Sequence, residues 1–160
     1  MKRTAKKKYL LFGVIASAVF FASMAYSHCQ IPCGIYDDPA RFDEIAEHIT
    51  TVEKCINQIT ELSADPSQNA NQLIRWVLNK EEHADELSHV VTFYFMAQRI
   101  NLPAEGDDAA QIDYVKKLTI LHEMLVYSMK AKQTTDLENV EKLRSLLEEF
   151  RIVYFPRNET

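Results

Sequence analysis

Apolar residues recur at steps of three and four in four separate stretches of this chain, a pattern typical of helices that bury one face. In the first stretch they are Phe42, Ile45, Ile49, Val52, Ile56, Ile59 and Leu62. Further stretches within residues 70–100, 112–129 and 137–150 repeat the pattern and are separated by short breaks. Only three glycines occur in 160 residues, which agrees with helices throughout. We expect an all-α, antiparallel up-and-down four-helix bundle over residues 37–160.

The first 27 residues have the three parts of a secretory signal peptide. Residues 1–8 are basic, residues 9–24 are apolar, and Ala25 and Ser27 place small side chains before a cut at His28. An uncleaved anchor is the alternative, but the apolar run is at the short limit for a membrane-spanning helix. We expect removal of a leader over residues 1–27, no stable membrane anchor afterwards, and a periplasmic or extracytoplasmic location.

The net charge excludes one class of partner. The whole chain carries −5, but the leader holds five of the 18 basic residues and no acidic ones. Residues 28–160 therefore carry 13 basic and 23 acidic residues, a net charge of −10. We do not expect nucleic acid as a partner of so acidic a body.

Several potential metal ligands lie close together in a short hook that precedes the bundle. The hook is residues 28–36, with the sequence His-Cys-Gln-Ile-Pro-Cys-Gly-Ile-Tyr. A cut before His28 frees its α-amine, which can bind one metal together with the amide nitrogen and thiolate of Cys29. Cys33 can supply the fourth donor, and the His28 ring can approach axially. Two nitrogen and two sulfur donors in a plane suit Ni(II) or Cu(II) better than zinc. Thiolates and an anionic amide stabilise a higher oxidation state, which favours redox chemistry.

Two other interpretations remain open on the residues alone. Cys29 and Cys33 can form a disulfide in an oxidising compartment, which would make the chain an exported, non-catalytic helical module. Glu86 and His89 form one Glu-x-x-His pair of the kind that di-iron bundles use twice, and we find no second pair. The remaining thiol, Cys55, falls on the apolar face of the first predicted helix, where we expect it to be buried and inert.

The hook resembles the start of the mature chain in nickel superoxide dismutases, which reads His-Cys-x-x-Pro-Cys-Gly-x-Tyr. Six positions here match that pattern, namely His28, Cys29, Pro32, Cys33, Gly34 and Tyr36. The resemblance implies one nickel ion per subunit, bound by the His28 amine, the Cys29 amide, and the Cys29 and Cys33 thiolates, with the His28 ring axial. It implies disproportionation of superoxide to oxygen and hydrogen peroxide through a Ni(II)/Ni(III) cycle.

The same resemblance implies roles for residues outside the ligand set. Tyr36 would border the open face of the metal, and Glu44 would hold the axial imidazole. His83 stands where characterised members have an arginine that assists this glutamate. A homohexamer, a leader peptidase and a nickel-loading factor are also implied, with a cytoplasmic location after cutting by a dedicated peptidase as the alternative. Because superoxide is an anion, we expect local lysines to offset the acidic body.

Overall fold

The computed structural model describes residues 31–155, and residues 1–30 and 156–160 lie outside that range. The predicted leader and the predicted ligands His28 and Cys29 therefore lie outside the described residues. The helices are α2 (Asp38–Leu62), α3 (Pro66–His89), α4 (Asp108–Gln133) and α5 (Glu138–Tyr154). A π-helix, η1 (Val90–Arg99), continues α3 without a break.

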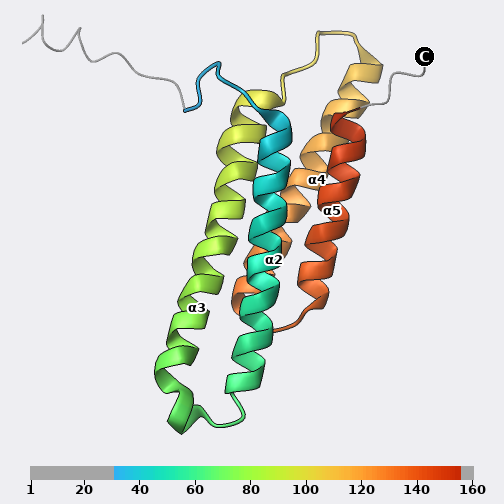
Figure 1. Ribbon diagram of the computed structural model, residues 1–160. Helices are drawn as coiled ribbons and strands as arrows, with labels where there is room; N and C mark the ends of the chain where they lie inside the picture. The colour runs from blue at the N-terminus through green and yellow to red at the C-terminus, as the bar shows by residue number, and fades with distance from the viewer. Residues whose placement is uncertain (1–30, 156–160) are drawn as a thin grey trace, which may run out of the picture. The chain divides into compact units, whose positions relative to one another are not determined.

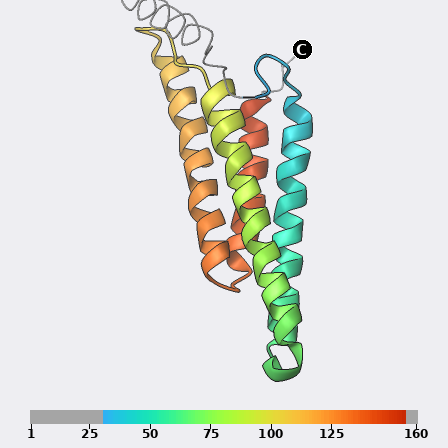
Figure 2. The ribbon, with the colours of Figure 1, turned by 90° about the vertical axis from the view of Figure 1, so that its left-hand side faces the viewer.

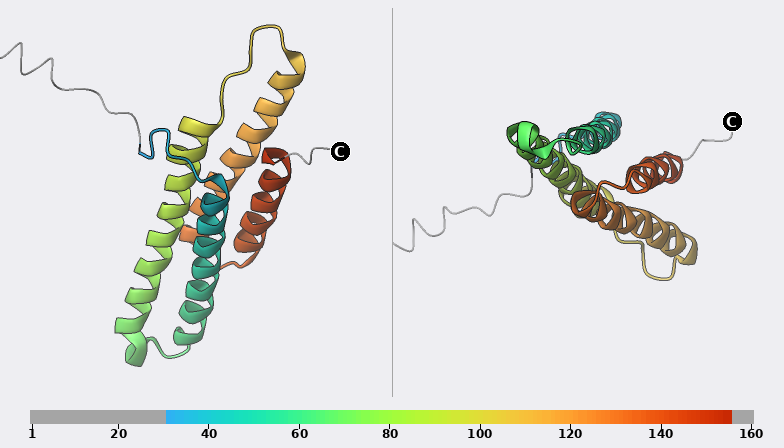
Figure 3. Two further views of the ribbon diagram at one scale, coloured as in Figure 1. Left: turned by 45° about the horizontal axis from the view of Figure 1, so that its top comes forward. Right: turned by 90° about the horizontal axis from the view of Figure 1, so that it is seen from below.

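Consecutive helices run antiparallel and pack side by side, and α5 closes the ring against α2 (Figure 1). The all-α, four-helix fold expected from the sequence is confirmed. The start of α2, the end of η1, the start of α4 and the end of α5 meet at one end of the bundle (Figure 2). At the opposite end the α2–α3 hairpin extends beyond the loop between α4 and α5 (Figure 3). Within residues 31–155, no helix combines the length and apolar content that crossing a membrane requires.

Aspartate caps define where three of the helices begin. Asp37, Asp65 and Asp107 each accept a hydrogen bond from the backbone N–H three residues later, at 3.2, 3.3 and 2.9 Å. Pro66 occupies the first position of α3, where a missing N–H costs nothing. The helix that we expected from about Ala70 therefore begins four residues earlier, because Asp65 and Pro66 together form a start signal rather than a loop.

The aromatic part of the core lies at the end of the bundle where the hook joins α2. Phe42, Phe95 and Phe150 are fully buried, and their ring centroids lie 5.0–5.2 Å apart. The Tyr154 ring lies 5.3–5.6 Å from all three. Edge and stacked contacts of this kind add about 0.5–1.5 kcal/mol per pair beyond the burial of area. This cluster gives the segment before α2 a rigid base.

Polar side chains in the middle of α3 bind neighbouring helices. Asn79 donates to the sulfur of the buried Cys55 at 3.1 Å, and burial raises the pKa of that thiol, as expected for an inert cysteine. Lys80 is 4% exposed, and its ammonium donates to the carbonyls of Lys132 and Thr134 at 2.7 and 2.9 Å. These carbonyls lie at the C-terminal end of α4, where backbone acceptors lack helical partners.

Replacing Lys80 with methionine keeps the length of the side chain but removes both hydrogen bonds. Because hydrogen bonds from a charged donor contribute about 1.5–3 kcal/mol, we expect Lys80→Met to lower the free energy of unfolding by about 2 kcal/mol. Urea denaturation measures the change. Lys142→Met is the matched control, since Lys142 is 43% exposed and lies 3.9 Å from its partner Glu123. Equal stability of the two variants would contradict this role for Lys80.

Candidate metal centre

The described part of the hook is a tight reverse turn with Cys33 at its apex. The Ile35 N–H donates to the Pro32 carbonyl at 3.1 Å, and both residues between them have positive φ angles, +40° at Cys33 and +85° at Gly34. Positive φ at both central positions is the signature of a type I′ turn. The Ile31–Pro32 bond is cis.

Cys33 fits a metal site better than a structural role in the core. Its side chain is exposed in the turn, whereas the other described cysteine, Cys55, is fully buried. Thiolate sulfur is a donor that suits nickel. Cys33 is disulfide-bonded in this structure, so the chain shown is the oxidised form of the hook. Within residues 31–155, no group of three or more potential ligands is placed to hold a metal ion.

Tyr36 packs against the end of η1. The guanidinium of Arg99 lies 4.3 Å from the centroid of the Tyr36 ring, and the Tyr94 ring meets it edge-on at 5.9 Å. The Gln98 amide donates to the Ile31 carbonyl at 3.3 Å, which ties the start of the turn to the same helix. In a helix with i→i+5 hydrogen bonds, residues four and five apart share a face, so η1 presents Tyr94, Gln98 and Arg99 together. We expected an ordinary α-helix through Ile100, because the apolar spacing carries no signal for a π-helix.

Asp38, the first residue of α2, lies at the centre of this arrangement. Its two oxygens accept hydrogen bonds from Arg99 at 2.8 and 2.6 Å, from Tyr94 at 2.6 Å and from Tyr154 at 2.8 Å. Burial opposes ionisation of Asp38, but the hydrogen bonds from the three partners outweigh it and hold the pKa below its usual value. In return, burial and the bond to Asp38 raise the pKa of Tyr154 to about 12. The sequence pattern alone singles out neither Asp38 nor Arg99 as part of a site.

The two residues expected to assist the axial imidazole have other partners here. Glu44 forms an ion pair with Arg41 of the same helix, and the Arg41 guanidinium lies 5.2 Å from the Tyr94 ring. His83 pairs instead with His48, with 2.9 Å between their Nδ1 atoms. His48 is partly buried. The i, i+3 spacing of Arg41 and Glu44 was the signal available in the sequence for their pairing.

His48 prefers its neutral form in the folded chain. Burial lowers the pKa of His48, and the neighbouring charge of His83 lowers it further, while Glu44, Glu86 and Glu47 partly oppose the shift. The contact between two Nδ1 atoms requires one donor and one acceptor, so the pair cannot hold two Nδ1 protons.

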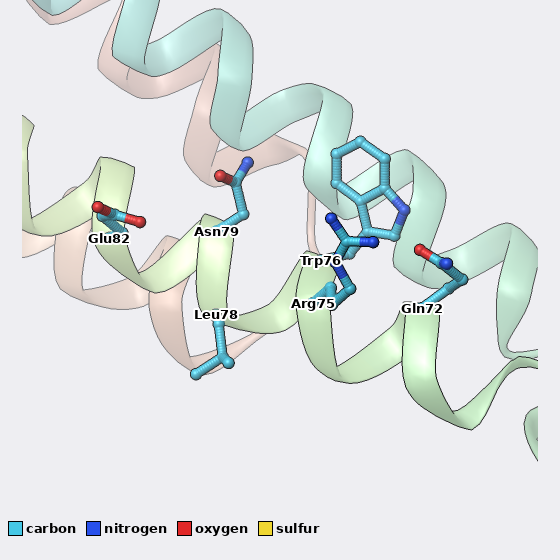
Figure 4. Close-up of a pocket in the computed structure, with 6 residues that line it drawn as sticks. All are labelled: Gln72, Arg75, Trp76, Leu78, Asn79 and Glu82. Carbon is cyan, nitrogen blue, oxygen red and sulfur yellow. The ribbon is translucent and has the colours of Figure 1, made fainter.

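A groove of about 430 Å³ lies on α3 away from the hook (Figure 4). In this view Trp76 and Asn79 reach toward α2, and Leu78 points away from it. The lining contains one carboxylate, that of Glu82, and neither histidine nor cysteine. This groove does not have the chemistry of a redox metal site, which leaves the hook end as the candidate centre.

The helical bundle and the cysteine-bearing turn at its end fit the class of four-helix metalloproteins that the sequence indicates. A family model described as nickel-containing superoxide dismutase matches residues 23–158, and the chain belongs to that family. The protein is therefore an oxidoreductase that acts on superoxide, with nickel as its cofactor. No curated protein and no solved structure shows a significant match to the chain. The di-iron alternative built on Glu86 and His89 has no support from the family assignment.

Gly34 offers a direct test of the turn. A β-carbon at Gly34 would meet nothing within 4 Å, so glycine is required there by its φ of +85° rather than by space. We expect Gly34→Ala to destabilise the turn by about 1–2 kcal/mol and to weaken nickel binding about tenfold or more, while the bundle melts at an unchanged temperature. Gly106→Ala is the control, because Gly106 has a φ of +83° and equally open surroundings in the loop before α4. Isothermal titration with Ni(II) under reducing conditions measures the affinity, and equal affinities for the two variants would contradict the prediction.

The His48–His83 pair predicts acid sensitivity. Because the folded-state pKa of His48 lies below its usual 6.5, its contribution to stability is fully present above about pH 6.5 and is lost as the pH falls toward the folded-state value. We expect the free energy of unfolding to fall more steeply in the wild type than in His48→Gln between about pH 7 and about pH 5. His122→Gln, at an exposed histidine, should follow the wild type. Identical pH profiles for the wild type and His48→Gln would exclude this role.

Proposed function

We propose that removal of residues 1–27 turns the hook into the nickel site of this superoxide dismutase. The ligands would be the α-amine of His28, the amide nitrogen of Cys29, and the thiolates of Cys29 and Cys33. The His28 imidazole would be the axial ligand. The observation that carries the proposal is the turn at Cys33, which presents one of the predicted donors at an exposed position shortly before the bundle begins.

Nickel held by these residues would supply one-electron redox chemistry through the Ni(II)/Ni(III) couple, and the overall reaction would convert two superoxide ions and two protons to oxygen and hydrogen peroxide. The chain would supply orientation and control of access. Tyr36 is 39% exposed and lies three residues after Cys33, a position from which its phenol would order water or substrate. Glu44 would hold the axial imidazole, and Arg41 rather than His83 would hold Glu44, since their ion pair is already formed.

Two basic groups lie close to the hook. We expected lysines to offset the net charge of −10, but the basic groups beside the hook are arginines. Arg99 and Arg41 supply guanidinium groups beside Tyr36 and Tyr94. Both are paired with carboxylates, so their charges are largely balanced and they do not offset the net charge of the chain.

We further propose a homohexamer in a periplasmic or extracytoplasmic compartment, matured by a leader peptidase and a nickel-loading factor. A cytoplasmic protein cut by a dedicated peptidase is the alternative. Export makes oxidation of the hook thiols a competitor of loading, because a disulfide removes the thiolate donors. Coupling nickel insertion closely to leader removal would keep the thiols available.

One added residue tests the role of the N-terminus. An alanine placed before His28 converts the predicted amine ligand into an amide. We expect nickel-dependent dismutase activity to be lost while the helical content and melting temperature are retained. An alanine added after Thr160 should leave activity unchanged, and full activity with the added N-terminal alanine would overturn the proposed ligand set.

A further inference from the structure

Arg99 is held more firmly than a partly exposed arginine normally is. Its Nε and one terminal nitrogen donate to the two oxygens of Asp38, at 2.8 and 2.6 Å, in a bidentate fork. Such a fork fixes the plane of the guanidinium as well as its position. The Asp38 side chain is 14% exposed, so the pair is partly shielded from solvent.

Asp38 is in turn fixed by groups from two other elements. Tyr94 of η1 and Tyr154 of α5 each donate one hydrogen bond to it, and both tyrosines pack against the buried phenylalanines of the core. The carboxylate at the start of α2 therefore cannot shift without disturbing three elements. It also lies at the helix N-terminus, where a negative charge is favoured.

The firmly held guanidinium covers one face of the ring that borders the hook. Arg99 lies 4.3 Å from the centroid of Tyr36, within the range of a cation–π contact, and Tyr94 meets the same ring edge-on. Arg99 and Tyr94 share a face because η1 has i→i+5 hydrogen bonds. Tyr36 thus rests on two side chains that Asp38 orients.

We propose that Asp38 and Arg99 are positioning residues for Tyr36, in which the carboxylate orients the guanidinium and the guanidinium orients the phenol beside the hook. The inference rests on the proposed function, since it concerns the residue that would control access to nickel. It adds two residues to the machinery of the site that match no fixed position of the hook motif. Their effect on the reaction would pass through Tyr36 and not through contact with the metal.

The first test needs no nickel. In the full mature chain without metal, we expect Arg99→Gln to speed amide hydrogen exchange at Ile35 and Tyr36 about tenfold, because the ring loses its support. Arg99→Lys keeps the charge but loses the fork, and should speed exchange by a smaller factor without changing the melting temperature. Arg144→Gln is the control, since Arg144 pairs with Glu53 between α5 and α2 through another arginine–carboxylate contact. Unchanged exchange at both amides in both Arg99 variants would overturn the inference.

The second test asks whether Arg99 acts through Tyr36. In the nickel-loaded protein, Arg99→Gln and Tyr36→Ala should each lower dismutase activity, and the double variant should be no slower than Tyr36→Ala alone. Multiplied losses would show that Arg99 acts independently of Tyr36 and would overturn the inference. A wild type without nickel-dependent activity would overturn the proposed function instead, and the exchange measurements would still decide whether Arg99 positions the ring.

Discussion

The hydrogen bonds to Asp38 are the interaction on which this end of the molecule depends. One carboxylate joins the first residue of α2 to Tyr94 and Arg99 of η1 and to Tyr154 of α5. Burying a charge is costly unless it is paired and hydrogen-bonded, and four hydrogen bonds meet that requirement here. These bonds fix the rotation and the height of three elements that the apolar core would hold only side by side. The hook ends two residues before Asp38.

The fold was predictable from the sequence because burial of apolar residues imposes a helical period. The residues from Phe42 to Ile59 on the predicted inner face of α2 are all buried, as the spacing required. Caps were predictable where a local signal existed, as at Asp37. The start of α3 was misplaced because Asp65 and Pro66 are equally compatible with a loop when no structure is in hand.

The candidate site was predictable only where the chemistry is local in sequence. The donors of the hook lie within six residues, so one short motif contains them. The contacts next to the hook join residues that are far apart in sequence. Arg99 and Tyr154 bind Asp38 across 61 and 116 positions, and the periodicity of apolar residues cannot predict such pairs. The spacing of apolar residues also does not predict the π-helix that brings Tyr94 and Arg99 to one face. Glu44 and His83 were expected to act together, but the structure pairs each with a different neighbour.

The hydrogen bond between Asp38 and Tyr154 joins residues 116 positions apart, so it can form only after nearly the whole chain has been synthesised. Tyr154 is the last residue of α5, and a chain elongating from its N-terminus exposes the hook long before that tyrosine exists. Until the final helix docks, Asp38 lacks one of its three partners. The contacts that hold Asp38 next to the hook are therefore completed last. A nascent or C-terminally shortened chain carries the ligand motif but lacks the hydrogen bond from Tyr154 to Asp38.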